Sequence, residues 1–205
     1  MRATVFMSPL EALRRATRES HGRLEAMPGQ ARLLALDFTR EEYRCALERM
    51  YGMYEPLGRA LSAHEYGRIW GVRVAERAEL LRSDLLEFGL TQAEVDALPR
   101  CSQLPPVDTF DRALGCAYVF EGSTLGGRVI FKHLARVFPP HAAVPLRFFA
   151  GDGERTAASW RRFCVMLDGA AVNLEELCAG ACAAFDAMAA WLNEPASAAA
   201  SKTRG

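Results

Sequence analysis

The sequence predicts a single all-α domain. Apolar residues recur with helical spacing along most of the chain, and serine and threonine capping boxes mark several helix starts. We find no convincing alternation of apolar and polar residues of the kind that indicates strands. A chain of 205 residues fits one compact unit that needs no disulfides. We therefore expect a single bundle of about six to eight helices.

The first helices are marked by their caps. Ser8-Pro9-Leu10-Glu11 combines a capping serine, a proline at the first helical position and a closing glutamate, and Met27-Pro28-Gly29 is expected to end this helix. Thr39 and Glu42 form a second capping box, which opens a long helix with an expected kink at Pro56.

The remaining elements follow from glycines, prolines and further caps. A third helix covers about residues 74–88, and Thr91 caps a short one that ends before Pro99. We expect, in order, a loop at 99–107, a glycine-containing helical stretch at about 108–137, an irregular segment at 141–153, and helices at about 155–167 and 172–193. Residues 1–8 are then an N-terminal arm, 9–193 the domain and 194–205 a disordered tail.

Composition excludes several classes of protein. Lys and Arg together number 25, as do Asp and Glu, so the chain lacks the basic excess of a dedicated nucleic-acid binder. No apolar run is long enough to cross a membrane, and the N-terminus becomes charged too soon for a signal peptide. Cys178 and Cys182, one helical turn apart, offer two metal ligands, but without a nearby histidine free thiols are favoured. We expect a cytoplasmic protein with no nucleic-acid or membrane partner.

The first predicted helix carries a polar stripe beside its apolar stripe. Its members lie within roughly 60° of one another on a helical wheel: Arg14, Arg18, His21 and Glu25. An imidazole can donate a lone pair to a metal, guanidinium groups pair with carboxylates, and a glutamate one turn beyond can orient the imidazole ring. The stripe therefore suits an anionic ligand with a metal at its centre. An ordinary solvent-exposed charged face is the alternative.

Residues 121–127 place three glycines in a stretch that otherwise favours helix. Each glycine costs about 1 kcal/mol relative to alanine inside a helix, so a packing or ligand-binding reason is expected. Gly115, Gly122 and Gly126 fall on one helical face, where a flat ligand could lie against the backbone, and we expect a bend at the pair Gly126-Gly127. Close helix packing and a simple loop are alternatives, and the phosphate-loop pattern is not met.

These two segments together resemble the haem oxygenase family. Residues 13–25 are similar to the family's proximal-helix pattern L-[KR]-x-A-T-x-x-x-H-x-x-x-E, and residues 122–127 to its glycine-rich distal helix. Weaker similarities follow the family's order at residues 50–57, at 160–163, and at Phe185 with Trp191-Leu192. The resemblance therefore covers residues 10–193.

The resemblance implies a helical bundle that holds haem between a proximal and a kinked distal helix. His21 would be the iron ligand and Glu25 its orienting partner. The haem propionates would meet arginines from both ends of the chain: Arg14, Arg18, Arg161 and Arg162. Gly122, Gly126 and Gly127 would let the distal helix approach the macrocycle and leave room for O2. The implied reaction cleaves haem, which is both cofactor and substrate, to biliverdin, CO and ferrous iron, with electrons from a reductase or ferredoxin.

One position departs from the animal members of the family. Ser123 stands where they carry an aspartate that organises distal water, so Ser123 with the glycine carbonyls, or Tyr54 through water, becomes the candidate for that role. The G-S-x-L-G-G form resembles bacterial members, including those encoded beside bacteriophytochromes, which use biliverdin as chromophore.

Other functions stay open at this point. A non-catalytic haem carrier or sensor of the same fold is the main alternative. A thiaminase-like enzyme acting on another aromatic ligand and a helix-turn-helix regulator are more distant ones. His133 is a candidate haem contact, with a capping or surface role as its alternative, and the arginines near residue 160 are candidates for docking an acidic electron donor.

Overall fold

The computed structural model describes residues 7–65 and 68–193, and this part of the chain forms nine α-helices and no strand. The helices are α1 (Pro9–Glu25), α2 (Pro28–Arg32), α3 (Arg40–Ser62), α4 (Arg68–Glu87), α5 (Gln92–Asp96), α6 (Phe110–Val137), α7 (Arg147–Ala150), α8 (Thr156–Asp168) and α9 (Leu174–Asn193). The all-α prediction is confirmed, and the helix count exceeds the expected one because two very short helices, α2 and α7, were not predicted. The expectations for residues 1–6 and 194–205 lie outside the described residues.

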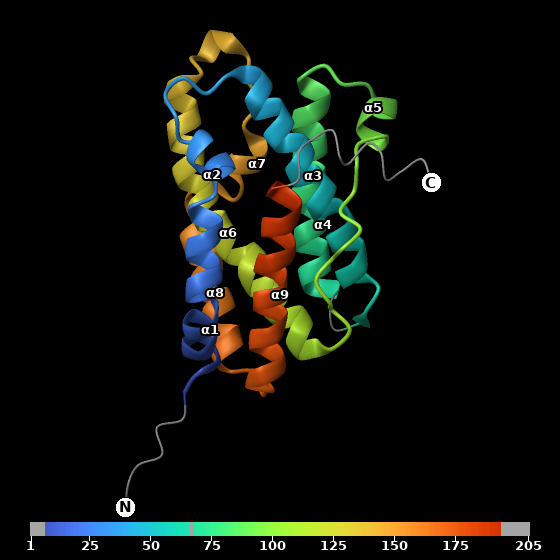
Figure 1. Cartoon of the computed structure of the whole chain (residues 1–205), viewed down its shortest axis with the longest axis vertical. Coiled ribbons are helices and arrows are strands. Elements are labelled where there is room, and N and C mark those ends of the chain that lie inside the picture. The colour runs from blue at the N-terminus through green and yellow to red at the C-terminus, as the bar shows by residue number, and fades with distance from the viewer. Residues whose placement is uncertain (1–6, 66–67, 194–205) are drawn as a thin grey trace, which may run out of the picture.

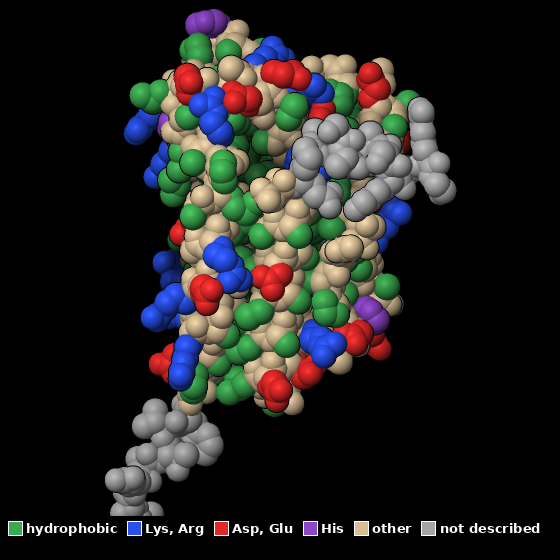
Figure 2. Space-filling view, in the orientation of Figure 1, with side chains coloured by type: hydrophobic (Ala, Val, Ile, Leu, Met, Phe, Trp, Pro, Cys, Tyr) green, Lys and Arg blue, Asp and Glu red, His purple; other side chains and the backbone are tan. Residues whose placement is uncertain are grey.

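The helices form an elongated bundle (Figure 1). In this view α1 and α8 lie on the left, α3 and α4 on the right, and α9 runs between them in front of α6. The most extensive contacts join α3 to α4, α6 to α9 and α1 to α9. Figure 2 shows acidic and basic side chains interspersed on this face, in keeping with the zero formal charge. None of the helices in the described ranges is long and apolar enough to cross a membrane.

The helix starts follow the predicted capping boxes. The Ser8 hydroxyl accepts a hydrogen bond from the Glu11 N–H, and the Glu11 carboxylate accepts one from the Ser8 N–H. The same reciprocal pair forms at Thr39 with Glu42. Two boundaries differ from the prediction. Helix α4 begins at Arg68, before the expected start at about residue 74. Helix α1 ends at Glu25, and Pro28 begins the separate helix α2 instead of ending α1. Proline suits the first position of a helix because its missing N–H would have no partner there.

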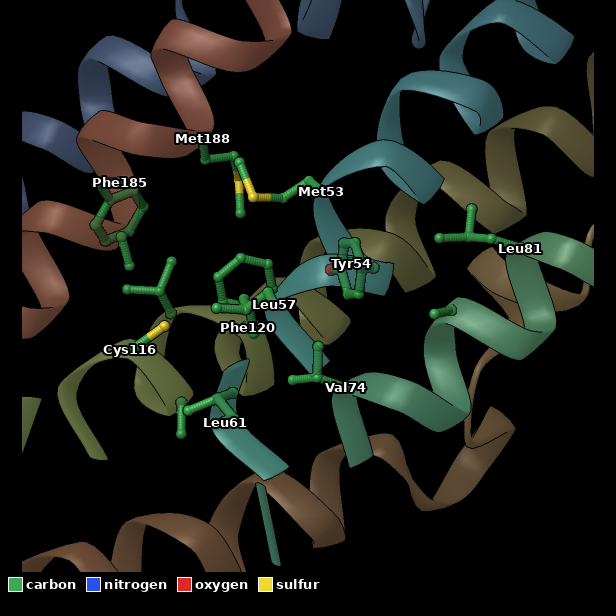
Figure 3. Close-up of a cluster of buried hydrophobic side chains, with 14 of the residues drawn as sticks. Met53, Tyr54, Leu57, Leu61, Val74, Leu81, Cys116, Phe120, Phe185 and Met188 are labelled. Atoms are coloured by element: carbon green, nitrogen blue, oxygen red, sulfur yellow. The ribbon is translucent and has the colours of Figure 1, made fainter. Parts of the chain in front are cut away.

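Helix α3 lies at the centre of the hydrophobic core (Figure 3). Its buried side chains meet those of α4, α6 and α9, and the cluster includes Met53, Tyr54, Leu57, Leu61, Val74, Leu81, Cys116, Phe120, Phe185 and Met188. Burial of each large apolar side chain contributes about 1.5–3 kcal/mol to folding. The backbone around Tyr54 is therefore held firmly from several sides. Pro56 lies within α3, which continues past it as helix.

Two glycines bring α6 and α9 into close contact. A Cβ on Gly115 would lie 2.0 Å from the Leu177 carbonyl oxygen, and a Cβ on Gly180 would lie 2.3 Å from the Arg112 carbonyl oxygen. The prediction that Gly115 belongs to a ligand-facing surface is therefore wrong, because α9 covers that turn of α6. Helix α6 is continuous from Phe110 to Val137, so the bend expected at Gly126-Gly127 does not interrupt it.

Candidate functional site

A cavity of about 600 Å³ lies among the helices and is walled mainly by α1, α3, α6 and α9, with residues of α2, α4, α7 and α8. Sites that bury a cofactor typically enclose about 300–1,000 Å³. Residues predicted from sequence line it from three helices: His21, Glu25, Tyr54, Gly122, Ser123, Gly126 and Gly127. The structure thus brings together two segments that are about a hundred residues apart in the sequence.

One wall carries an imidazole. His21 Nδ1 lies 3.4 Å from Glu25 Oε2, one helical turn further along α1. The His21 ring also packs edge-on against Phe185 of α9, with ring centroids 5.6 Å apart. If Nδ1 carries the proton that faces the carboxylate, Nε2 keeps its lone pair for a metal. The geometry of α1 therefore supports His21 as a single histidine ligand.

Another wall, formed by α6, has no side chain at three of its lining positions. A Cβ added to Gly126 would meet no atom within 4 Å, whereas one on Gly122 would lie 3.4 Å from the Trp160 ring and one on Gly127 would lie 3.8 Å from Phe149. The same three glycines, unlike Gly115, line the cavity. Close approach of a ligand to the α6 backbone is therefore sterically open, most of all at Gly126.

The cavity rim is apolar and exposed. Leu34, Leu125 and Val129 line the cavity while 47%, 37% and 61% of their respective surfaces remain exposed. Clustered apolar surface of this kind marks a binding site. An imidazole from α1, a glycine-containing stretch of α6 and an apolar rim fit a flat, mostly apolar ligand with a metal at its centre. The residues present therefore fit haem.

A hydroxyl pair joins α3 to α6 at this cavity. The Tyr54 and Ser123 hydroxyl oxygens lie 3.2 Å apart, and Ser123 Oγ also lies 2.7 Å from the Phe120 carbonyl oxygen. Because a carbonyl only accepts, Ser123 donates to Phe120, and Tyr54 therefore donates to Ser123. The rings of Phe120 and Phe148 pack edge-on against the Tyr54 ring. The two predicted residues thus meet directly.

Sequence reasoning missed Arg77 of α4, which also lines the cavity. Its guanidinium lies 4.6 Å from the centroid of the Phe148 ring, and Nη2 donates to the Phe148 carbonyl at 3.3 Å. Its Nε is buried and has no hydrogen-bond partner among the described residues. Nothing in the spacing of α4 distinguishes this arginine from a surface residue. Phe148 and Phe149 were missed as well, since they belong to α7, within the segment expected to be irregular.

Asp84 holds α7 against the cavity. This side chain of α4 is completely buried and accepts hydrogen bonds from the backbone N–H groups of Phe148, at 2.9 Å, and Arg147, at 3.3 Å. The Arg147 guanidinium also pairs with it. A buried carboxylate is tolerated only when it is paired in this way. The short helix, with its two phenylalanines, is therefore anchored to α4.

The four predicted propionate-binding arginines are exposed and do not line the cavity. Arg14 and Arg18 lie on α1, and Arg161 and Arg162 lie around a shallow depression on the outer face of α8. Burial raises the pKa of the cavity-lining Tyr118, and a hydrogen bond with Thr17 and then the charge of Arg14 oppose that rise. Contact between these arginines and a ligand stays a prediction.

His133 lies outside the cavity walls. Its Nε2 is 3.1 Å from the Ala35 carbonyl oxygen, which ties α6 to the segment that follows α2. The candidate haem contact at this residue is thus replaced by a structural hydrogen bond.

An all-α bundle in which one histidine and a glycine-rich helix line a mainly apolar cavity fits the class of haem-binding proteins. The chain matches the family model described as "Heme oxygenase" over residues 7–194. It is 28% identical over 161 residues to Heme oxygenase PigA of Pseudomonas aeruginosa, covering 78% of this chain and 77% of that protein. It is 38% identical over 98 residues to a Heme oxygenase of Xanthomonas campestris pv. campestris, covering 48% of this chain and 54% of that protein. The chain belongs to the haem oxygenase family and is a haem-degrading oxidoreductase.

Proposed function

We propose that this enzyme cleaves haem to biliverdin, CO and ferrous iron in a reaction that consumes O2 and electrons. The observation that carries the proposal is that His21 of α1 and the open α6 backbone at Gly126 line one cavity, together with the Tyr54–Ser123 hydroxyl pair. Bound haem supplies the redox-active iron and the ring that is opened. The protein binds, orients and shields it.

On the proximal side, His21 Nε2 is the proposed iron ligand and Glu25 keeps the ring in the required tautomer. We assign the propionates to arginines near the junction of α1 and α8: Arg14, Arg18, Arg161 and Arg162. Pairing of guanidinium groups with propionates would fix the rotation of the ligand within the cavity.

On the distal side, Gly122, Gly126 and Gly127 admit the ligand and leave space for O2. Tyr54 and Ser123 both direct their hydroxyl hydrogens to protein atoms, but the Tyr54 oxygen keeps a lone pair that can accept from a water. Such a water can donate a hydrogen bond into the cavity. We therefore assign the organisation of distal water to this pair, in the place of an aspartate.

Two partners belong to this proposal. A reductase or ferredoxin supplies the electrons, and a bacteriophytochrome receives the biliverdin. The second partner is proposed from the resemblance of the sequence G-S-T-L-G-G at residues 122–127 to phytochrome-associated members of the family.

The test is a visible spectrum of the purified protein with one equivalent of haemin, followed in air after ascorbate is added. Loss of the Soret band with growth of a broad red absorption would establish conversion to biliverdin. A Soret band that persists with ascorbate and with a ferredoxin and its reductase would contradict the proposed reaction and support a haem carrier. Failure to bind haemin would contradict both.

A further inference from the structure

A buried carboxylate precedes the first glycine of the cavity wall. Glu121 of α6 is 8% exposed and does not line the cavity, whereas Gly122, the next residue, does. Removal of a carboxylate from water costs several kcal/mol unless a partner compensates it. An apolar side chain would fill this position more simply, so the presence of a glutamate calls for an explanation.

The partner of Glu121 is Arg73 of α4. Arg73 Nε pairs with Glu121 Oε1, and Arg73 Nη2 donates to Glu121 Oε2 at 3.0 Å, so the contact is bidentate. The same Nη2 lies 3.5 Å from Asp152 Oδ2, in the segment that follows α7. A bidentate guanidinium–carboxylate pair fixes both the distance and the relative orientation of its two groups. This pair therefore sets the position of α6 relative to α4.

Helix α4 is in turn locked to α3, the helix that carries Tyr54. A Cβ on Gly58 of α3 would lie only 3.1 Å from the Ala75 backbone nitrogen of α4, so the two backbones are in close contact. Ser123 lies two residues beyond Glu121 on α6. The Glu121–Arg73 pair thus connects the helix pair that carries Tyr54 to the helix that carries Ser123.

We infer that Glu121 and Arg73 are positioning residues for haem cleavage: their ion pair holds the glycine segment of α6 where the Tyr54–Ser123 hydrogen bond can form beside the ligand. This inference rests on the proposed function. Its physical basis is that a shift of about 1 Å in a reacting group can lower a rate about 100-fold. In this partly buried ion pair the carboxylate is buried and the guanidinium is half-exposed, and the pair serves specificity of position, because well-packed apolar residues would serve stability equally well.

The experiment compares the single variants Arg73→Met and Glu121→Met with the double variant Arg73→Met/Glu121→Met. The matched control is Arg112→Met/Glu176→Met, which removes an Arg–Glu pair that joins the first turn of α6 to α9. Four quantities are measured. They are the unfolding midpoint without haemin, the haemin dissociation constant, the rate of biliverdin formation, and the spectral pH midpoint, which is the pH at which the visible spectrum of the haemin complex is halfway through its change with pH.

Arg73→Met leaves the Glu121 carboxylate without its partner, and Glu121→Met leaves Arg73 with Asp152 alone, so each single variant is expected to lower the unfolding midpoint. The double variant should recover most of that loss and bind haemin within about threefold of the unmodified protein. Its spectral pH midpoint should nevertheless differ from that of the unmodified protein. Its rate of biliverdin formation should remain roughly 10- to 100-fold lower than that of the unmodified protein. The control pair should change neither the spectral midpoint nor the rate.

A double variant with unmodified stability, spectral midpoint and rate would overturn the inference. If the double variant does not fold, the same four measurements on Glu121→Gln test the inference, because glutamine keeps the shape of the side chain and one acceptor for Arg73. If the unmodified protein binds haemin without converting it, the proposed function fails, while the spectral midpoint still tests the positioning role.

Discussion

The Tyr54 hydroxyl of α3 donates to the Ser123 hydroxyl of α6 across 3.2 Å, at the edge of the haem-binding cavity. The bond joins the central helix of the core to the glycine-containing helix that a ligand must approach. Ser123 cannot act as a proton donor by ionising, as an aspartic acid could. Its contribution depends on a hydroxyl network, and that network begins with Tyr54.

Removal of either hydroxyl should therefore slow turnover more than it weakens binding. Tyr54→Phe removes one hydrogen bond and keeps the ring packing against Phe120 and Phe148, so we expect it to cost about 1 kcal/mol of stability. Ser123→Ala also removes the hydrogen bond to the Phe120 carbonyl, and we expect it to cost about 1–2 kcal/mol. The haemin dissociation constant should change little, and the rate of biliverdin formation should fall roughly 10- to 100-fold in both variants. Unchanged rates in both variants would remove the hydroxyl pair from the mechanism.

His21 has the most direct test. His21→Ala should abolish the spectrum typical of histidine-ligated haem and stop biliverdin formation, because no other imidazole lines the cavity among the described residues. Added imidazole should partly restore both by entering the space left by the ring. His141→Ala, an exposed residue outside the cavity, is the control. Normal turnover by the His21 variant would disprove the assignment of the axial ligand.

Substitution of Gly126 should have opposite effects on helix stability and on ligand binding. Because a Cβ there meets no atom within 4 Å, Gly126→Ala should stabilise the protein without haemin by up to about 1 kcal/mol through higher helix propensity. The same methyl group would occupy space that the ligand needs, so haemin affinity or turnover should fall. Unfolding midpoints and haemin titrations measure the two effects.

The contrasting variant is Gly115→Ala. Its Cβ would collide with the Leu177 carbonyl of α9, so it should destabilise the protein with or without haemin. If Gly126→Ala left both haemin affinity and turnover unchanged, the ligand would not lie against this part of α6.

These two glycines also mark what sequence alone can predict. Helix starts at Ser8, Thr39 and Thr91 were predictable because a capping box consists of residues within one turn of each other. It was not predictable that Gly115 packs against α9 while Gly126 lines the cavity, because this depends on which other helix covers each turn of α6. Each of the two glycines follows a leucine in a stretch that favours helix, so the preceding residue does not distinguish them.

The same limit explains the missed parts of the site. His21 and Glu25 are one turn apart on one helix, so their spacing placed them together in advance. Arg77 reaches the cavity only because α4 packs beside α3 and α7 folds over it, through contacts made by Phe148 and Asp84. Such tertiary contacts leave no periodic signal in the sequence of α4.

Acid should weaken the attachment of α2, which carries part of the cavity wall. Hydrogen bonds from Arg32 and then from the Thr39 backbone N–H lower the pKa of Glu42 to about 2 in the folded protein. The unfolded value is about 4.3, so the stabilisation is fully present above about pH 5 and is lost as the pH falls toward 2. The unfolding midpoints of the unmodified protein and of Glu42→Gln should therefore differ at pH 6 and converge as the pH approaches 2. A constant difference over this interval would contradict the assignment.

The proposed propionate contacts predict an effect on both affinity and the position of ring opening. Arg14→Gln and Arg18→Gln should each raise the haemin dissociation constant by about two- to tenfold, since exposed charge pairs contribute modestly. They should also change the proportions of the biliverdin isomers, because the propionates set the rotation of the macrocycle and hence the bridging carbon that faces the open distal space. Chromatography of the products measures those proportions.

Arg15 provides the matched control for these variants. It is exposed on the same helix as Arg14, but successive residues of a helix point about 100° apart, so Arg15 faces away from the cavity side of α1. Arg15→Gln should leave affinity and isomer proportions unchanged. Equal effects at Arg14 and Arg15 would mean that only the net charge of the surface matters. If the isomer proportions changed only in Arg161→Gln or Arg162→Gln, the propionates would be assigned to α8 instead of α1.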